Sequence, residues 1–549
     1  MKNLIQPSMQ LFFVGLFAFI VSMNLQPQPS QAAMSDLLIS TPDPRFGAVE
    51  AYLAPELAAD LGIGWDRMII SWSGRQPESP DDWNIRIKEI GWVETAQLHG
   101  REVVGLLIGT PEWATDGTAQ IGVPRGLYLP HDDPENLWAE FVRDITSEYR
   151  GRIDRWIIWN EPDIAVEDYG TQFEGSVEDY YQLVKVAYQA ARSVNPKAVI
   201  HLAGLTHWHD VENQLAPYLE RFIQTALQDP YALENDYFFD VATFHVYFTT
   251  DTVFDILHLQ RRILQRYGLQ KEIWLNETNA APLDDPQYPW KYPLFSVTQD
   301  QQAGFILQAN ALALAAGAER IGVYKLIDEV PPLPGGDSYG LYRPDSSARP
   351  AAAAMSVVTN HYAGTTKATA IQSHTYFLIR LDRADEGVTH VAWARTEQDA
   401  TLRIQASTRA SNATLYNHLG ETTPILTNAY GWYRLELPAA LCNDPNHGCI
   451  VGGEPLVLVE YTTVSTQPQY QISNTPTSPA TSSATTTSAE DMDSQELSTT
   501  NATYTVQAGD YLARIARKNG TTSAAIYDLN KLSSTVIFIG QVLQLPNTQ

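Results

Sequence analysis

The sequence predicts an α/β fold: a (β/α)8 barrel, followed by a β-sandwich and a small C-terminal βααβ module. Two observations predict the barrel. From Phe46 onward, short apolar runs alternate with amphipathic helical patterns, as in parallel α/β folds. Two of these runs also end in an Asn-Glu pair. The sandwich is predicted by a change after residue 362, where short strand-like runs, at 375–381, 388–393, 400–404 and 456–461, are separated by turns.

The barrel needs eight strands, and eight apolar runs are present: 46–49, 67–72, 103–108, 156–160, 198–203, 239–245, 273–276 and 321–326. Helical patterns lie between most of them. We expect one helix to begin at Asp133, as an N-cap followed by Pro134. A second should begin at Ser176 with a capping box to Asp179, and 301–316 should be a third, Ala-rich helix.

One stretch organises the chain: Arg-Trp-Ile-Ile-Trp-Asn-Glu-Pro-Asp at 155–163. Pro162 cannot donate to a sheet ladder and biases Glu161 toward extended backbone, so a buried strand should end there. A single such Glu would be interpreted as a solvated loop residue. The run 272–279 has the same form, however, and places Glu277 after an apolar strand and an Asn.

The spacing of the two carboxylates agrees with a barrel. Glu161 and Glu277 would end strands four and seven and lie 116 residues apart. A barrel unit takes on the order of 30–40 residues, so three units fit this interval. Both side chains would then project at the C-terminal end of the barrel, where barrel enzymes carry their active sites.

These two motifs resemble glycoside hydrolase clan A, the retaining (β/α)8 enzymes. The stretches 110–114 and 149–153 are most similar to the family 39 β-xylosidases and their relatives. The resemblance covers the barrel region, and it implies that Glu161 is the acid/base and Glu277 the nucleophile. Two carboxylates in different environments can protonate the leaving oxygen and stabilise an oxocarbenium-like centre.

The same resemblance implies roles for four more residues. Asn160 would bind the sugar 2-hydroxyl, and the alternative is an Asx-type turn. Arg67 would keep the nucleophile ionised, and the alternative is an ordinary surface arginine. His245 and Tyr247, which alternation points the same way, would line the site, whereas a core histidine is the competing interpretation.

Other candidates are less specific. Trp113 and Trp159 are either sugar platforms or barrel packing. Strand eight lacks the clan's usual Trp and reads Val-Tyr-Lys-Leu at 323–326, so Lys325 is a candidate contact for an acidic or hydroxyl-rich substrate. The sequence contains no Gly-rich phosphate loop and no metal-ligand cluster above chance, so we expect neither a cofactor nor a metal.

The C-terminal module, 503–549, resembles a LysM domain, which implies binding of glycans that contain N-acetylglucosamine, such as peptidoglycan or chitin. The candidate groove residues are Gly509, Asp510, Tyr511, Leu512, Ile537 and Phe538. Tyr511 stands where the family usually has Thr or Ser. It would either stack on a sugar or cover the start of a helix, and the sequence favours neither.

Three further features are the N-terminal segment, the pair of cysteines and the segment before the C-terminal module. Residues 1–33 are typical of a secretory signal cleaved after Ala32, with an uncleaved anchor as the alternative. Cys442 and Cys449 would form a disulfide, or, with further ligands, a metal site. The Ser/Thr/Pro-rich segment 464–502 cannot form a core and should be a linker.

The predicted domains are therefore a signal (1–33), a barrel (34–362), a sandwich (363–463), a linker and the module. With 36 basic and 63 acidic residues, a net charge of −27 argues against nucleic acid and anionic membranes as partners. We expect a secreted, wall-associated retaining hydrolase of a β-linked xyloside or glucoside. The alternatives are a non-catalytic glycan-binding protein and a hydrolase of the wall glycan itself.

Overall fold

The computed structural model describes residues 41–84, 89–165, 170–288, 295–329, 338–410, 412–444, 448–462, 502–506, 515, 519, 525–526, 529–531 and 541–546. The predicted signal segment and all of the predicted linker except Ala502 lie outside these residues, so both stay predictions. Within the described part of the chain, no helix has the length and apolar character needed to cross a membrane.

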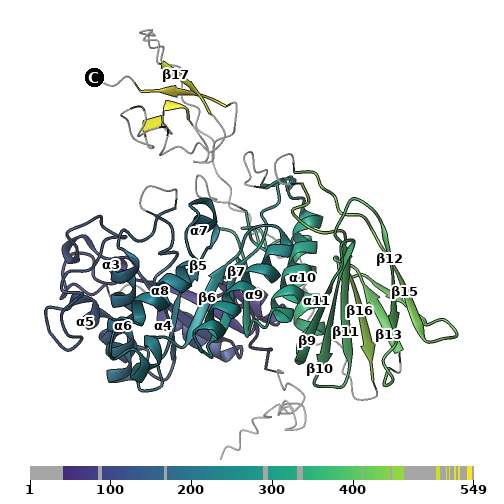
Figure 1. Cartoon of the computed structure of the whole chain (residues 1–549), viewed down its shortest axis with the longest axis horizontal. Coiled ribbons are helices and arrows are strands. Elements are labelled where there is room, and N and C mark those ends of the chain that lie inside the picture. Colours follow the sequence, from purple (N-terminus) through teal and green to yellow (C-terminus); the bar gives the residue numbers. More distant parts are fainter. Residues whose placement is uncertain are drawn as a thin grey trace, which may run out of the picture. The chain divides into compact units, whose positions relative to one another are not determined.

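The eight predicted strands form a closed parallel barrel in the order β1 to β8 (Figure 1). They are β1 (Phe46–Val49), β2 (Trp65–Ser71), β3 (Glu102–Ile108), β4 (Arg155–Ile158), β5 (Val199–Leu205), β6 (Val241–His245), β7 (Glu272–Thr278) and β8 (Arg320–Val323). Every neighbouring pair is parallel, including β1 with β8, which closes the barrel. The predicted α/β barrel is therefore confirmed.

The ends of the strands differ from the prediction at two important places. β4 ends at Ile158 rather than Asn160, because Trp159 adopts a left-handed φ of 72° that ends the extended backbone. Asn160 and Glu161 therefore lie in the loop that follows β4. In contrast, β7 extends to Thr278, so Glu277 is the next-to-last residue of the strand. Glu161 thus reaches the C-terminal end of the barrel from a loop, and Glu277 reaches it from a strand.

Helices surround the barrel: α2 (Pro55–Asp60), α3 (Trp72–Arg75), α4 (Glu89–Leu98), α5 (Leu137–Glu148), α6 (Val177–Val194), α7 (Trp208–Glu212), α8 (Tyr218–Ala226), α9 (Thr250–Arg266), α10 (Gln299–Ala315) and α11 (Pro350–His361), with short 3-10 turns at Ala51–Leu53, Glu112–Ala114 and Leu233–Phe238. The capping box at the start of α6 is confirmed. The Ser176 hydroxyl accepts from the Asp179 amide, and the Asp179 carboxylate accepts from the Ser176 amide.

The predicted N-cap of α5 was wrong. α5 begins at Leu137, and its N-cap is Asn136, whose side chain accepts from the Ala139 amide at 3.1 Å. Asp133 instead accepts from the Glu135 amide at 2.9 Å, in the turn before the helix. Asp followed by Pro is typical of both turns and helix starts, so the dipeptide alone did not separate the two.

The N-terminal end of the barrel is filled by aromatic and charged side chains. Trp65 and Trp274 lie with ring centroids 5.3 Å apart. The Arg155 and Arg320 guanidinium groups lie over the Trp274 ring, and both pair with Glu102. These residues come from the first three positions of their strands, so this end is packed and the other end is left for chemistry.

The chain then forms the predicted sandwich. Its strands are β9 (Thr365–Gln372), β10 (Tyr376–Arg383), β11 (Val388–Ala394), β12 (Ala400–Gln405), β13 (Asn412–Tyr416), β14 (Thr422–Pro424), β15 (Trp432–Leu437) and β16 (Leu456–Tyr461). One sheet has six strands in the order β14-β13-β16-β11-β10-β9, and β12 pairs with β15 in a second sheet. The prediction had missed β9, β13, β14 and β15.

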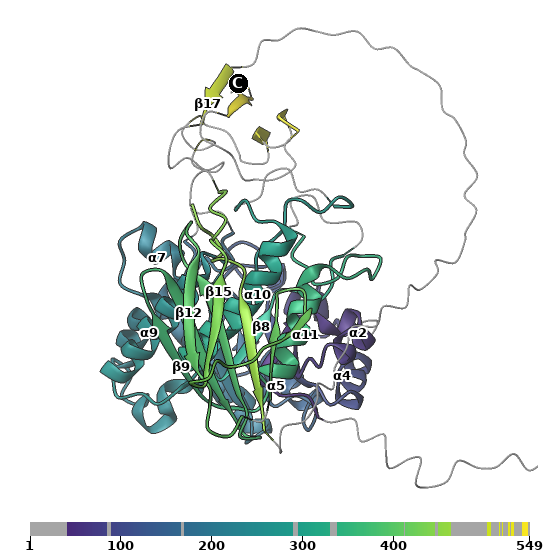
Figure 2. The same ribbon diagram turned by 90° about the vertical axis from the view of Figure 1, so that its right-hand side faces the viewer.

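Helix α10 joins the barrel to the sandwich. It is buried on nearly every face, because the barrel lies on one side and the six-stranded sheet on the other. Phe377, Ile379 and Trp393 of that sheet belong to the same hydrophobic cluster as the apolar side chains of α10. Figures 1 and 2 show α10 and α11 between the barrel and strands β9 to β11.

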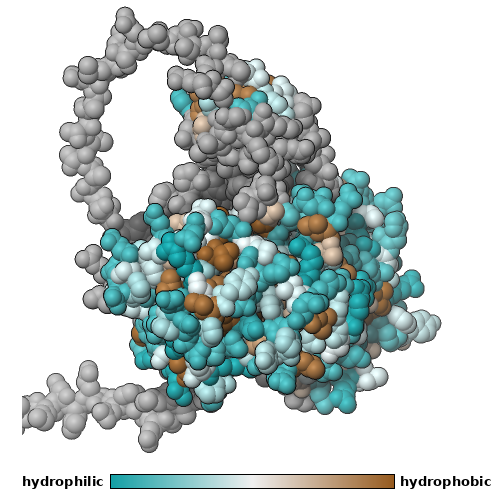
Figure 3. Space-filling model, turned by 60° about the vertical axis from the view of Figure 1, so that its left-hand side comes forward, coloured by the Kyte–Doolittle hydropathy of each residue, from teal (hydrophilic) through white to brown (hydrophobic). Residues whose placement is uncertain are grey.

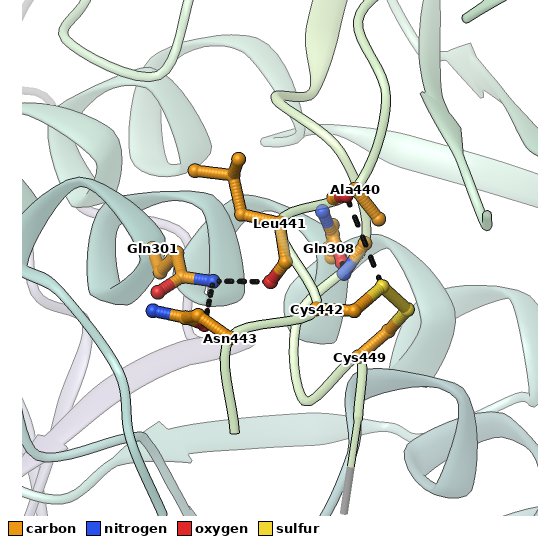
Figure 4. Close-up of a disulfide and its surroundings, with 8 residues drawn as sticks. Gln301, Gln308, Ala440, Leu441, Cys442, Asn443 and Cys449 are labelled. Carbon is orange, nitrogen blue, oxygen red and sulfur yellow. Dashed lines mark hydrogen bonds between the residues drawn. A yellow bond between two sulfur atoms is a disulfide. The ribbon is translucent and has the colours of Figure 1, made fainter. Parts of the chain in front are cut away.

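Cys442 and Cys449 form the predicted disulfide (Figure 4). Their loop is tied to α10: the Gln301 amide donates to the Leu441 carbonyl at 3.0 Å and to the Asn443 side chain at 3.2 Å. The disulfide therefore closes a loop that contacts a barrel helix.

The described part of the C-terminal module is a pair of antiparallel strands, β17 (Ala502–Thr505) and β18 (Val542–Leu545). They share a small cluster with Val506, Ile515 and Ile526. Asn530 exchanges hydrogen bonds with the backbone of Gln544.

The protein surface agrees with the charge of the sequence. On the face shown in Figure 3, hydrophilic side chains predominate and hydrophobic ones form small separate patches. Amphipathic barrel helices produce this pattern, because they turn their apolar stripes toward the strands. Five residues at helical spacing on α6, which are Tyr180, Leu183, Val184, Ala187 and Ala191, are all buried.

Candidate active site

Three ionisable side chains meet at the C-terminal end of the barrel. Glu161 follows β4, His245 ends β6, and Glu277 lies near the end of β7. One oxygen of each carboxylate and one ring nitrogen of His245 all lie within 4.8 Å of one another. The sequence had placed both carboxylates at this end by counting strands. The structure adds their proximity to each other.

Glu277 lies in a cationic and hydrogen-bonding environment. Its Oε1 pairs with the Arg67 guanidinium, and its Oε2 accepts from the Tyr247 hydroxyl. Burial alone would raise the pKa of Glu277. The positive charge of Arg67 and the neighbouring His245, together with the Tyr247 and Arg67 hydrogen bonds, outweigh burial and lower the pKa below its usual value. Glu277 is therefore ionised at neutral pH.

Glu161 has different neighbours. Its Oε1 lies 2.7 Å from His245 Nδ1, and its Oε2 accepts from the Gln172 amide at 3.2 Å. The side-chain oxygen of Gln172, Oε1, also accepts from the Asn160 side-chain amide at 3.2 Å. Glu161 is the more exposed of the two carboxylates, with 17% of its side chain accessible against 8% for Glu277. It is the one that solvent reaches more readily.

His245 connects the two carboxylates. Its Nδ1 lies 2.7 Å from Glu161 and 3.5 Å from Glu277, and its Nε2 lies 3.5 Å from Arg67 Nη1. Because a guanidinium only donates hydrogen bonds, Nε2 faces it as an acceptor. The proton of neutral His245 is then on Nδ1, directed at Glu161.

Space for the His245 ring comes from a glycine on the next strand. A Cβ added at Gly204 of β5 would lie 2.0 Å from His245 Nε2 and 2.3 Å from Cδ2. Any side chain there would displace the ring. Gly204 is therefore part of the site, although nothing in its sequence context distinguishes it from a glycine in an ordinary strand.

Asp163 ties the loop that carries Glu161 to the loop after β5. Its Oδ2 accepts from the Thr206 amide at 2.7 Å, from the Thr206 hydroxyl at 3.0 Å and from the His207 amide at 3.0 Å. The segment it anchors is strained: Trp159, Glu161 and His207 have φ values of 72°, 44° and 64°. Burial, with the nearby charge of Asp210, raises the pKa of Asp163 to about 7.

The three ionisable groups are close enough together to be considered as metal ligands. Glu161, His245 and Glu277 are residue types that ligate metals. However, Arg67 already places a positive charge on Glu277, and Nδ1 of His245 is directed at Glu161. A cation bound here would be repelled by the Arg67 guanidinium. The protonated Nδ1 of His245 would have no free lone pair with which to bind it. The donor set does not fit a divalent metal.

Aromatic rings border the site on the β8 side. Tyr247 packs edge-to-face against Tyr324 and Tyr339, with ring centroids 6.1 Å and 5.5 Å apart. Tyr324 and Tyr339 also contact each other at 5.7 Å. The Asn279 amide donates to the carbonyls of both, which fixes this part of the site.

Some predicted residues lie elsewhere. The buried Trp159 ring donates to the Gln172 carbonyl and packs on Trp138, so it is packing rather than a platform. Trp113 donates to the Gln76 carbonyl and lines a cavity of about 170 Å³ beside α5. Lys325 pairs with Glu50 at 2.9 Å rather than standing free.

The six predicted LysM groove residues, Gly509 to Leu512 with Ile537 and Phe538, lie outside the described residues. Besides Gly204, Gln172 and Asp163 of the barrel site had escaped the sequence prediction. Gln172 lies in an irregular loop with no pattern to signal it. Asp163 follows the Asn-Glu-Pro motif directly, and that position was the available signal.

Comparison with known proteins identifies the C-terminal module first. Residues 504–546 match the model of the LysM domain family. The C-terminal module is a LysM domain. A curated relative, the probable peptidoglycan endopeptidase LytE of Bacillus subtilis (strain 168), is 48% identical over 46 residues. The match covers 8% of this chain and only 14% of LytE, so the two proteins share this module and not a whole architecture.

Solved structures match the barrel and sandwich. A family 39 glycoside hydrolase from Bacteroides cellulosilyticus WH2 has a TM-score of 0.57 and 16% identity, over 77% of this chain and 82% of that one. A family 39 enzyme from Xanthomonas axonopodis pv. citri has a TM-score of 0.50 and 12% identity, over 76% and 95%. A family 30 endoxylanase from Clostridium papyrosolvens C71 has a TM-score of 0.50 and 10% identity, over 77% and 98%. At these identities the likeness establishes the fold, which is a glycoside-hydrolase-like barrel.

Proposed function

We propose that this protein is a retaining glycoside hydrolase, with Glu277 as the nucleophile and Glu161 as the acid/base. The observation that carries the proposal is that one oxygen of Glu161 and one oxygen of Glu277 lie within 4.8 Å of each other. Retaining enzymes hold their carboxyl groups roughly 5–5.5 Å apart, whereas inverting enzymes need about 6.5–9.5 Å to admit a water. Carboxylate oxygens this close support the narrower, retaining arrangement.

The environments of Glu277 and Glu161 support their different roles as nucleophile and acid/base. Glu277 is ionised, and Arg67 and Tyr247 orient its two oxygens, as a nucleophile requires. Glu161 is more accessible and contacts His245 and Gln172, which suits a group that exchanges a proton with the leaving oxygen and then with water.

The reaction proceeds in two displacements. Glu161 donates its proton to the glycosidic oxygen while a Glu277 oxygen bonds to the anomeric carbon and the glycosidic bond breaks. Glu161, now a carboxylate, takes a proton from water, which attacks the anomeric carbon and releases Glu277. Each carboxylate returns to its starting state. Two inversions leave the anomeric configuration of the product unchanged.

The substrate we propose is a β-xyloside or β-glucoside, because the sequence motifs resemble β-xylosidases. The LysM domain would hold the enzyme on wall glycans that contain N-acetylglucosamine after secretion through segment 1–33. A second candidate is hydrolysis of the wall glycan itself. The LysM domain favours it, since LysM in that role would bring the barrel to its substrate.

A panel of aryl β-glycosides tests the proposal. Wild type should hydrolyse an aryl β-xyloside or β-glucoside, and Glu277→Ala should be nearly inactive on every substrate. Glu161→Ala should retain the first step on a substrate with an activated leaving group, and azide should restore turnover. Glu94→Ala, an exposed helix substitution, is the matched control. Activity on wall glycan alone would favour the second candidate, and full activity of Glu277→Ala would exclude both.

A further inference from the structure

The outer face of the β12–β15 sheet combines features that no part of the barrel chemistry uses. The two strands alternate strictly. Their inward side chains, Leu402, Ile404, Tyr433, Leu435 and Leu437, pack into the sandwich. Their outward side chains are Thr401, Arg403, Gln405, Trp432, Arg434 and Glu436, and all are exposed.

No other described element covers this face. In Figure 1, β12 and β15 lie at the edge of the sandwich farthest from the barrel, and in Figure 2, viewed from that side, they lie in front. The sheet is therefore solvent-facing on one side and core-facing on the other, and its outward side chains are available to a ligand.

The charge on this face is unusual for this chain. Register places Arg403 directly opposite Arg434, and two like charges in that position repel. Arg434 pairs with Glu436, but Arg403 has no ion-pair partner among the described residues. In a protein with a net charge of −27, this sheet keeps an uncompensated cation beside a second arginine. An anionic ligand would relieve the repulsion.

Exposed aromatic and apolar side chains lie on β15 and in the loop that precedes it. Trp432 is 39% exposed, and Tyr430 and Leu426 of the preceding loop are 83% and 88% exposed. Trp432 lies opposite Gln405 and diagonally from Arg403, about 7–8 Å away along the sheet. The Gln405 amide donates to the Gly431 carbonyl at 2.9 Å, which anchors the loop between the two aromatic residues.

We propose that this face binds an acidic polysaccharide whose sugar residues carry carboxylates. The apolar face of a pyranose ring would pack on Trp432 and Tyr430, and the Arg403 fork would bind the carboxylate at the rim of a neighbouring ring. A phosphate polymer without sugar rings would satisfy the arginines and leave the aromatic rings exposed. At physiological salt, charges beyond about 8 Å are screened, so the overall negative charge does not prevent this local contact.

Affinity electrophoresis of the full chain through gels containing polygalacturonate tests the proposal. Soluble N-acetylglucosamine oligomers are added to occupy the LysM domain. Wild type should be retarded, Arg403→Ala should bind about tenfold more weakly, and Trp432→Ala about fivefold more weakly. Arg409→Ala is the matched control, since it removes the same charge from an exposed loop of the sandwich, where Arg409 pairs with Glu386.

Three results would overturn the proposal. The first is absence of retardation by polygalacturonate. The second is equal retardation of wild type, Arg403→Ala and Trp432→Ala, which would place binding elsewhere. The third is retardation by polyphosphate that Trp432→Ala does not change, because it would indicate simple attraction of anions. Hydrolysis should be the same in all variants, since the substituted side chains are exposed and distant in sequence from the barrel site. Arg403→Ala should melt no lower than wild type, because it removes a like-charge repulsion.

Discussion

Substitution of Gly204 by alanine tests whether the position of His245 controls the site. The added Cβ would lie 2.0 Å from His245 Nε2, whereas an ordinary contact begins at 3.4 Å. The ring would have to move by roughly 1.4 Å to reach an ordinary contact. The ring cannot move by that amount and keep its 2.7 Å contact with Glu161, because it is buried and its Nδ1 already contacts Glu161.

A misplacement of about 1 Å in a catalytic arrangement costs about 100-fold in rate. We therefore expect Gly204→Ala to lower kcat for an aryl β-glycoside about 100-fold. Overpacking should also lower the free energy of unfolding by about 1–3 kcal/mol. A thermal melt at the assay pH separates the two effects, because a folded but inactive variant is the expected result.

Gly91 provides the matched control. It lies in α4, and a Cβ there would have no neighbour within 4 Å. Gly91→Ala should leave kcat unchanged and stabilise the helix by roughly 0.5–1 kcal/mol. If Gly204→Ala remained folded with the kcat of wild type, the role of His245 between the two carboxylates would be refuted.

The remaining predictions concern stability, positioning and attachment. The pKa of Asp163 is about 7 in the fold, against 3.8 for an unperturbed aspartate. The raised pKa favours the folded state at low pH, and this contribution is lost as the pH rises through about 7. Asp163→Asn should therefore be more stable relative to wild type at pH 8 than at pH 5, as measured by thermal melts, and an unchanged difference would contradict the burial argument. Gln172→Ala should lower kcat about tenfold through the lost hydrogen bond to Glu161, whereas a change in KM alone would indicate a binding role. Replacing Cys442 and Cys449 by serine should cost about 2 kcal/mol of unfolding free energy and leave kcat unchanged, and a large loss of activity would show that their loop affects the site. Deleting 503–549 should abolish retention on insoluble peptidoglycan without affecting hydrolysis of a small glycoside, and continued retention would place wall binding elsewhere.

Elements with strong periodicity could be predicted from the sequence. The alternation of strands and helices predicted the barrel, and the capping box at Ser176 was readable because both partners are close in sequence. β15 shows strict alternation and was still missed, since its outward residues include a Trp that hides the pattern.

The candidate site was predictable only where a motif pointed to it. Glu161 and Glu277 end apolar strands of the same form, so spacing was enough to bring them to one end of the barrel. Gln172 and Gly204 could not be found this way. Their contacts depend on how loops and neighbouring strands fold back in three dimensions, and neither residue has a local pattern that encodes those contacts.

The stereochemistry of hydrolysis tests the central claim most directly. Proton NMR follows the first sugar that wild type releases from an aryl β-glycoside, before mutarotation mixes the anomers. Two displacements at Glu277 predict that the β anomer forms first. An initial α anomer would mean a single inverting displacement by water, and it would contradict the assignment of Glu277 as the nucleophile.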